Sequence, residues 1–137
     1  MHLNIYTDGA CWGNPGPAAI GAVIKDEHEK VLVKVSRYIG EGTNNQAEYQ
    51  AVIAALKEAT RFKADATTLY LDSELVAKQL TGSYKVRNLF LFPLHKEAAE
   101  LCKKFARLSI VLVGHEGNNE AHALAKAALN KFTSHKG

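Results

Sequence analysis

The sequence predicts an α/β fold in which a five-stranded mixed sheet is covered by helices. Two observations lead to this prediction. Three consecutive strand-like runs with polar or Gly-rich connections open the chain, which favours an antiparallel meander: 3–7, 20–25 and 31–38. Two short β-branched runs follow between helical patterns, as parallel strands reached by crossovers do: 67–71 and 108–113.

The opening strands are recognised by alternation and by the segments that connect them. In the first strand, Leu3 and Ile5 alternate with Asn4 and Tyr6. The segment 13–17 contains two prolines and two glycines, so it can be neither helix nor central strand. The polar run 26–30 reads as a hairpin connection into the third strand, where every second residue from 31 to 35 is valine.

Apolar residues at helical spacing fill the remaining segments. In the first helix, the residues from Val52 to Ala59 include an i, i+3, i+4, i+7 stripe. Ser73 has the place of an N-cap for the second helix. Pro93 lies in the first turn of the third, where its missing N–H is not needed. The four predicted helices cover 46–62, 73–80, 93–105 and 118–132.

Length and composition indicate one folded domain. Of the 137 residues, 47% are hydrophobic and 23% charged, so we expect a single domain over 1–132 and a short tail over 133–137. No stretch is apolar enough to span a membrane, and no secretory signal is visible. Cys11 and Cys102 cannot form a disulfide framework and indicate a reducing, cytoplasmic setting. The net charge of +3 permits a polyanionic partner without requiring one.

Three carboxylates stand out by their positions. Asp8 and Asp72 directly follow two predicted strands, at the ends where open α/β sheets gather ligands, although each alone also fits a turn or capping aspartate. Glu48 shares the apolar stripe of its helix with Val52, and a buried carboxylate is costly unless it is paired or holds a metal. Otherwise Glu48 is an ordinary acid at a helix start. If the helix lies over the strand ends, the three oxygens converge and suit Mg²⁺ or Mn²⁺.

Two histidines have less specific positions. His122 shares a helical face with Ala125 at the edge of the apolar stripe, which fits a histidine at the rim of the core. His115 lies in a Gly-flanked stretch and fits either an ordinary exposed residue or a mobile proton carrier. There is no phosphate-binding loop, nucleophile elbow or zinc-ligand spacing, which disfavours a P-loop enzyme, a serine hydrolase and a structural zinc protein.

Four segments resemble motifs of the type 1 ribonuclease H family, in the family's order and over nearly the whole chain: 6–17, 43–48, 71–73 and 119–125. The first segment reads YTDGACWGNPGP and is nearly complete, and the set together is specific. The resemblance implies the ribonuclease H-like fold, with three antiparallel and two parallel strands and helices on both faces. It also implies metal-dependent hydrolysis of the RNA strand of RNA/DNA hybrids by an endonuclease.

The resemblance assigns roles to individual residues. It implies that Asp8, Glu48 and Asp72 hold two divalent ions, Mg²⁺ or Mn²⁺, in a two-metal mechanism. His115 would match the loop histidine that assists proton transfer or product release. Contacts to the RNA and its 2′-hydroxyls, and one contact to a DNA phosphate through Thr43, would come from a substrate-binding set. This set is Gly9, Ala10, Asn14, Thr43, Asn44, Asn45, Gln46 and Ser73.

The sequence departs from the family in two places. His122 stands where the family has a fourth metal-site aspartate. We include His122 among the catalytic and metal-binding residues and expect a site that favours Mn²⁺, because imidazole is a poor ligand for Mg²⁺. The basic handle of some members is also missing, which leaves a smaller basic surface: Lys85, Arg87, Lys103 and Lys104.

Other functions stay open beside the enzyme. The loss of the fourth acid fits a catalytically weak or inactive module that binds hybrids or duplexes and has kept the fold. An interaction or nucleic-acid-repair accessory protein is a third alternative. The expected partner is an RNA/DNA hybrid, no membrane or protein partner is implied, and a monomer is expected.

Overall fold

A computed structural model describes residues 1–136, with side chains described as far as Thr133. The strands are β1 (His2–Cys11), β2 (Gly16–Lys25), β3 (Val31–Gly42), β4 (Ala66–Leu71) and β5 (Leu108–Leu112). The helices are α1 (Asn44–Ala59), α2 (Glu74–Leu80), α3 (Phe92–Cys102) and α4 (Asn119–Lys136), with the 3-10 segments η1 (Thr60–Phe62) and η2 (His115–Asn118). None of the described helices has the length and apolar character that crossing a membrane requires.

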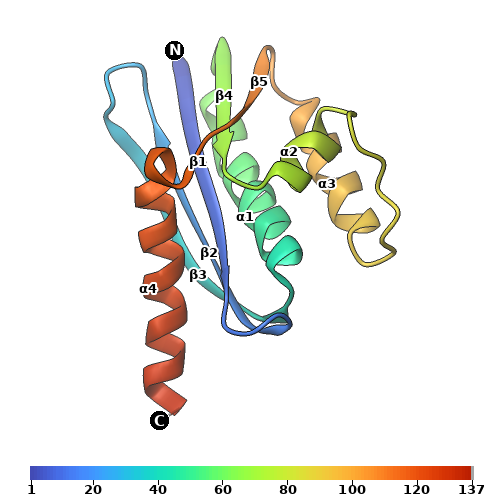
Figure 1. Ribbon diagram of the computed structural model, residues 1–137. Coiled ribbons are helices and arrows are strands. Elements are labelled where there is room, and N and C mark those ends of the chain that lie inside the picture. The colour runs from blue at the N-terminus through green and yellow to red at the C-terminus, as the bar shows by residue number, and fades with distance from the viewer. Residues whose placement is uncertain (137) are drawn as a thin grey trace.

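The five strands form one mixed sheet in the order β3-β2-β1-β4-β5. β1, β2 and β3 pair antiparallel, whereas β4 pairs parallel with β1 and with β5. Helix α4 covers β1, β2 and β3 on one face, and α1 lies on the other face with α2 and α3 beside it (Figure 1). The predicted α/β fold, with three antiparallel and two parallel strands and helices on both faces, is confirmed.

The core lies mainly between the sheet and α1. Along β4 every second side chain is buried, and Leu69 and Leu71 are fully inaccessible to solvent. Leu3 and Ile5 of β1 belong to the same cluster, as does Leu56 of α1. The alternation that predicted these strands is therefore the alternation between the α1 side of the sheet and its opposite face.

Asp8 does not follow the first strand, as the sequence indicated, but lies inside it. β1 continues to Cys11 because its second half still pairs with β2, and Asp8 is opposite Gly21. The parallel pairing of β1 with β4 ends at Thr7 and Leu71, one residue before Asp8. Asp8 and Gly9 therefore still pair with β2 on one side of the strand, whereas the parallel pairing with β4 on the other side has already ended.

Several other ends differ from the predicted ones. Helix α1 starts at Asn44 because Thr43 caps it: Thr43 Oγ1 accepts from Gln46 N, and Gln46 Oε1 accepts from Thr43 N. β2 begins at Gly16, and Pro17 fits there because it lies beyond the last pair that β2 makes with β1. Helix α4 continues to Lys136, past the expected end at 132.

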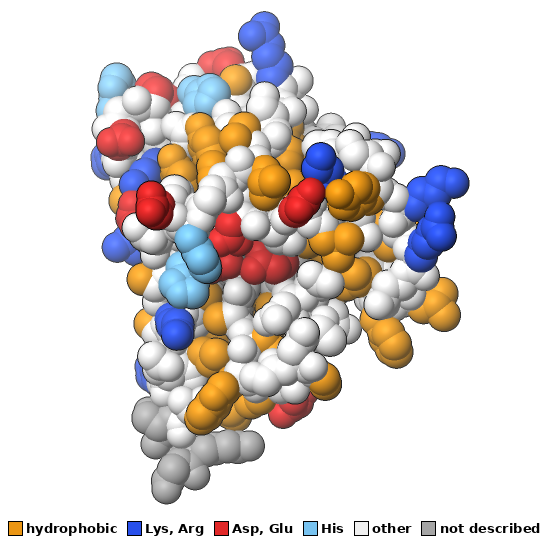
Figure 2. Space-filling model, viewed as in Figure 1, with side chains coloured by type: hydrophobic (Ala, Val, Ile, Leu, Met, Phe, Trp, Pro, Cys, Tyr) orange, Lys and Arg blue, Asp and Glu red, His pale blue; other side chains and the backbone are white. Residues whose placement is uncertain are grey.

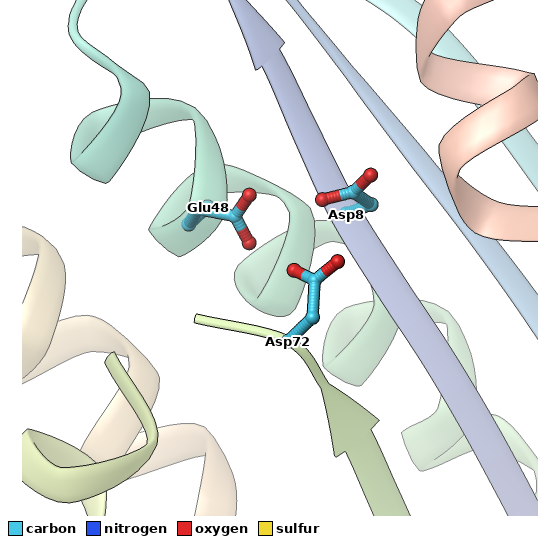
Figure 3. A group of neighbouring side chains, drawn as sticks. All are labelled: Asp8, Glu48 and Asp72. Carbon is cyan, nitrogen blue, oxygen red and sulfur yellow. The ribbon is translucent and has the colours of Figure 1, made fainter. Parts of the chain in front are cut away.

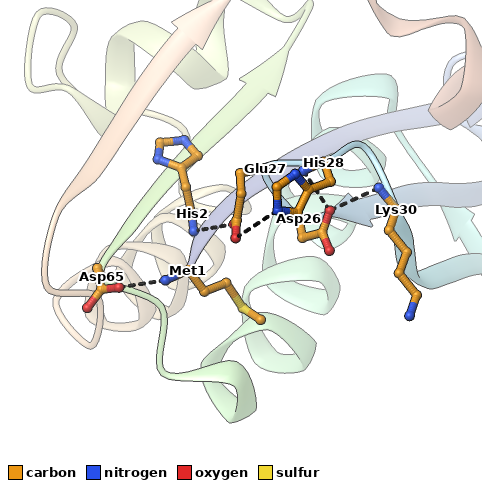
Figure 4. A network of polar contacts seen from close by, with 7 residues as sticks. All are labelled: Met1, His2, Asp26, Glu27, His28, Lys30 and Asp65. Atoms are coloured by element: carbon orange, nitrogen blue, oxygen red, sulfur yellow. Dashed lines mark hydrogen bonds and ion pairs between the residues drawn. The ribbon is translucent and has the colours of Figure 1, made fainter.

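Polar contacts tie the amino-terminal end of β1 to its surroundings (Figure 4). The amino group of Met1 lies 2.6 Å from Asp65 Oδ2, and His2 N donates to Glu27 Oε2 at 2.8 Å. Asp26 Oδ1 accepts from the backbone of Lys30 in the β2–β3 hairpin. These contacts fix the first strand at the end away from Asp8.

Candidate active site

Asp72 is placed by the end of β4 and the start of α2. β4 ends at Leu71, and Ser73 caps α2 by accepting a hydrogen bond from Val76 N at 3.2 Å. Asp72 is therefore held between a strand end and a helix cap. Since β4 runs parallel to β1, Asp72 emerges at the same level of the sheet as Asp8.

Glu48 reaches this level because α1 crosses β1 at a glycine. A Cβ on Gly9 would lie 2.6 Å from the carbonyl carbon of Ala47 and 2.7 Å from Glu48 N, so any side chain would push the helix away. Gly9 N–H points at both acids, 3.0 Å from Asp8 Oδ1 and 3.1 Å from Glu48 Oε1. The same glycine therefore allows the close approach and holds two carboxylates.

Three carboxylates converge at this point. Asp8 from β1, Glu48 from α1 and Asp72 from the end of β4 point toward one another (Figure 3), and each offers an oxygen within 4.8 Å of the others. Asp8 is only 3% exposed, and Glu48 Oε2 is a buried oxygen without a hydrogen-bond partner. A buried carboxylate oxygen left unpaired is costly, and convergent hard oxygens fit a divalent cation.

The crowding of these acids changes their protonation. Burial, followed by the nearby charge of Asp8, raises the pKa of Glu48 to about 10. The same two causes raise the pKa of the Asp72 carboxyl. Without a cation, the cluster therefore retains a proton near neutral pH, and a bound divalent ion would replace it.

His122 approaches Asp8 from the opposite face of the sheet. Its Nδ1 lies 2.7 Å from Asp8 Oδ2. A second close approach makes this possible, since a Cβ on Gly21 would lie 2.1 Å from Ala121 O and 2.5 Å from Ala125 N of α4. Gly21 is the β2 partner of Asp8. Helix α1 therefore approaches Asp8 over Gly9 on one face of the sheet, and α4 approaches it over Gly21 on the other.

His115 lies at the start of η2 and is the most exposed of the five candidate catalytic residues. Its side chain is 76% exposed, and Nδ1 lies 3.4 Å from Asp72 Oδ2. The His115 and His122 rings meet edge to face, with centroids 5.3 Å apart. The two imidazoles therefore form one wall beside the acids.

These residues surround an open cleft of about 400 Å³, which we call the acidic cleft. Figure 2 shows acidic side chains gathered in a hollow with histidines at its edge. Four residues of the expected substrate-binding set also line it: Gly9, Asn44, Asn45 and Ser73.

The rest of the substrate-binding set lies close by. A neighbouring hollow of about 240 Å³ brings Asn14, Thr43 and Gln46 together with Phe90 of the α2–α3 loop. Asn14 Oδ1 accepts from Asn44 N at 3.0 Å, which ties the β1–β2 turn to the start of α1. Ala10 lines a third hollow along α4.

The expected basic surface is divided by α3. Lys85 and Arg87 are exposed in the loop before α3, whereas Lys103 and Lys104 are exposed just after it. The two pairs of cations therefore lie at opposite ends of that helix.

Two structural residues of the site were not identified from the sequence. Asn118 is buried and donates from Nδ2 to Thr7 O at 2.7 Å, which joins the start of α4 to the residue before Asp8. Its place four residues before His122 on one helical face was the available signal. Gly21 gave no signal, because it lies in an apolar run that reads as an ordinary strand.

Fold and site together define a class: an α/β protein with an acidic cleft, able to hold a metal ion, where its central parallel strands end. Residues 6–128 match the family described as reverse transcriptase-like. A ribonuclease H of Chromohalobacter salexigens is 36% identical over 98% of this chain and 88% of its own length. The chain belongs to the ribonuclease H family.

Solved structures agree with this assignment. RNase H1 of Halobacterium salinarum superposes with a TM-score of 0.91 at 42% identity, covering 96% of this chain and 99% of that one. The N-terminal RNase H domain of Rv2228c from Mycobacterium tuberculosis gives 0.91 at 36% identity, covering 94% and 99%. The chain spans 36% of the full bifunctional mycobacterial protein and 64% of the curated Halobacterium ribonuclease HI.

Proposed function

We propose that this protein is a metal-dependent endonuclease that hydrolyses the RNA strand of RNA/DNA hybrids. The observation that carries the proposal is the convergence of Asp8, Glu48 and Asp72 around the unpartnered Glu48 Oε2. LC11-RNase H1 was solved in complex with an RNA/DNA hybrid, and it is 39% identical with a TM-score of 0.89 over 96% of this chain and 99% of that one. This likeness supports the same substrate class here.

The three acids would hold two divalent ions through their convergent carboxylate oxygens. Mg²⁺ or Mn²⁺ bound there supplies an activated water and neutralises charge on the phosphate. Gly9 N–H holds Asp8 and Glu48 in place through its contacts to both carboxylates. His115, exposed beside Asp72, carries a proton between the cleft and solvent. Among the substrate-binding set, Asn14, Asn44 and Gln46 would contact the 2′-hydroxyls that distinguish RNA from DNA.

His122 defines the second candidate function. Its 2.7 Å contact with Asp8 puts an imidazole where the family has an acid, which removes a negative charge beside the metal site. As a ligand, it would favour Mn²⁺ over Mg²⁺. If the contact instead holds Asp8 away from a metal, the protein is a weak or inactive module that still binds hybrids.

The test is cleavage of an end-labelled RNA/DNA hybrid with Mg²⁺ and with Mn²⁺, beside RNA/RNA and DNA/DNA duplexes. Cleavage restricted to the RNA strand of the hybrid is expected, with more product in Mn²⁺. Equal cleavage of a DNA duplex would contradict the ribonuclease assignment, and tight hybrid binding without product would favour the binding module. We also propose a cytoplasmic setting, which the free thiols Cys11 and Cys102 support. We expect a monomer, and light scattering of the same sample measures its molar mass.

A further inference from the structure

A buried glutamine on α2 turns its amide toward the protein interior. Gln79 is 5% exposed and belongs to the buried side of α2 with Val76 and Ala77. Tyr49 of α1 is fully buried, and its hydroxyl donates to Gln79 Oε1 at 2.5 Å. Burying an amide or a hydroxyl is costly unless it finds a hydrogen-bond partner. Here the two side chains satisfy each other across two helices.

The same glutamine also contacts the segment after α2 and the helix α3. Gln79 Nε2 donates at 3.5 Å to the carbonyl oxygen of Lys85, in the α2–α3 loop that comprises residues 81–91. Gln79 O lies 3.1 Å from Nε2 of His95 on α3. The His95 ring meets the Tyr49 ring edge to face, with centroids 6.3 Å apart. One buried residue therefore joins α1, the α2–α3 loop and α3.

The α2–α3 loop itself is mostly exposed. It projects beside α2 and α3 in Figure 1, and within 81–91 every residue is exposed except Val86 and Leu91. These two apolar residues pack on the core. Apolar packing has no preferred direction, whereas a hydrogen bond has a defined distance and angle. The contact of Gln79 with Lys85 O therefore fixes the position of the loop more sharply than the apolar contacts do.

The α2–α3 loop forms one wall of the hollow of about 240 Å³ beside the acidic cleft. Phe90 and Leu91 line this hollow together with Thr43 and Gln46. Thr43 and Gln46 form the capping box of α1, the helix that also carries the buried tyrosine. The start of α1 is therefore one wall and the loop is another, and the buried glutamine holds the two walls together.

We propose that Gln79 is a positioning residue for the hybrid, which sets the spacing of the two walls through Tyr49 and Lys85 O. The inference rests on the proposed function, under which Asn14 and Gln46 of this hollow would contact the RNA strand. Gln79 does not line the acidic cleft, so it acts on how tightly the hybrid is held and not on hydrolysis. A loop without this contact would have to be ordered when the hybrid binds, and that ordering costs binding free energy.

Removing both partners of the buried pair tests this role. Tyr49→Phe/Gln79→Met replaces the hydroxyl and the amide by apolar groups of similar size, so neither partner is left unpaired and the protein should stay folded. From initial rates on the hybrid, KM is expected to rise about 2- to 10-fold, the range for one hydrogen bond, with kcat unchanged. Tyr49→Phe alone breaks the same contact and should raise KM in the same direction.

A second measurement needs no nuclease activity. Lys85 and Arg87 are exposed trypsin sites in the α2–α3 loop, and cleavage there requires the loop to open locally. The double variant should be cut faster than the parent at these two sites, which mass spectrometry of the fragments identifies. Ile24→Val is the matched control, because it removes one buried methylene from β2, opposite Ile5 and outside the hollow. It should change neither KM nor the rate of cutting, and thermal melts compare the stabilities of all variants.

The outcomes separate this role from the function on which it rests. An unchanged KM in the double variant, or a lower kcat at constant KM, overturns the positioning role. The role is also overturned if Ile24→Val raises KM as much as the double variant, because lost stability would then be the cause. Equal tryptic cutting of parent and double variant shows that Gln79 does not hold the loop, whatever the substrate is. If the unsubstituted protein neither binds nor cleaves the hybrid, the proposed function itself is contradicted.

Discussion

His122 Nδ1 lies 2.7 Å from Asp8 Oδ2, and the β2 position opposite Asp8 leaves no room for a side chain beneath α4. Gly21 is the β2 partner of Asp8, and its missing side chain lets α4 rest directly on the sheet. The departure from the family at position 122 is thus a contact with the most buried of the three acids. Its consequences can be measured.

His122→Ala and His122→Asp separate the two roles of this histidine. If His122 is a ligand, His122→Ala weakens Mn²⁺ binding, whereas His122→Asp restores an oxygen ligand and raises Mg²⁺-supported cleavage more than Mn²⁺-supported cleavage. Mn²⁺ affinity is measured by electron paramagnetic resonance, and hybrid cleavage is measured in parallel on the same variants. The ligand role is lost if the Ala variant binds Mn²⁺ like the parent.

Asp8→Asn should abolish cleavage and leave the fold intact. Asparagine lacks the negative charge with which Asp8 would hold the metal ions, but its side-chain oxygen can still accept from Gly9 N. The metal-free variant should melt no lower than the parent, because one of three crowded charges is gone. Hybrid cleavage and a thermal melt in EDTA test both statements, and undiminished cleavage by the folded variant would remove Asp8 from the site.

His115→Ala should lower the rate without changing metal affinity. The side chain is mostly exposed and contacts only one of the acids, Asp72, at 3.4 Å. The loss should be about 10²-fold at most, as for general acid–base assistance. Single-turnover cleavage and Mn²⁺ titration are compared, and a weakened Mn²⁺ affinity would show that the role is misassigned.

The metal-free protein should become less stable as pH rises. The pKa of Glu48 is raised to about 10 in the fold, so between its ordinary value near 4.5 and that value the unfolded chain binds fewer protons than the folded one. Stability contributed by the retained proton is complete below the ordinary value and falls with increasing pH, by at most about 1.4 kcal/mol per unit. Urea unfolding in EDTA at pH 5, 7 and 9 measures it.

Glu48→Gln is the control for this pH dependence. It keeps the shape of the side chain and removes its titration, so the slope of stability against pH should become shallower. Mg²⁺ or Mn²⁺ should stabilise the parent more as pH rises, because a smaller fraction of Glu48 then carries the proton that the ion must displace. A variant with the same slope as the parent would show that other groups cause the effect.

Gly21→Ala should destabilise the protein by about 1–3 kcal/mol, as overpacking does. The new methyl group would collide with backbone atoms of Ala121 and Ala125, so α4 must move and the His122–Asp8 contact must lengthen. Gly114→Ala is the matched control, because a Cβ there meets no atom within 4 Å. Denaturant unfolding of both variants measures their free energies of unfolding. Equal values for Gly21→Ala and Gly114→Ala would contradict the role given to Gly21.

The sequence predicted the sheet because β4 and the start of β1 alternate between buried and partly exposed side chains, whereas β2 was recognised as a continuous apolar run. It was less informative about where elements end. Asp8 was placed after β1 because the alternation was read over 3–7 only, whereas pairing with β2 extends the strand to Cys11. The start of α1 moved to Asn44 because the cap at Thr43 outweighs the apolar stripe.

Within the site, the residues with family motifs could be named from the sequence, but their contacts could not. Nothing local in the sequence shows that His122 contacts Asp8, because that contact depends on how closely α4 packs on Gly21. Trp12 and Lys126 are 114 residues apart in the chain, and both line the hollow along α4 because that helix packs beside β1. Tertiary packing, and no periodic pattern, determines such pairs.

The Asp8–His122 contact can form only when α4 is docked on the sheet. Asp8 belongs to the first strand and His122 to the last helix, and they are 114 positions apart. During synthesis the three carboxylates emerge well before α4. Until that helix docks, Gly21 is uncovered and Asp8 has no imidazole partner. A chain that stops short of α4 therefore lacks the imidazole that contacts Asp8.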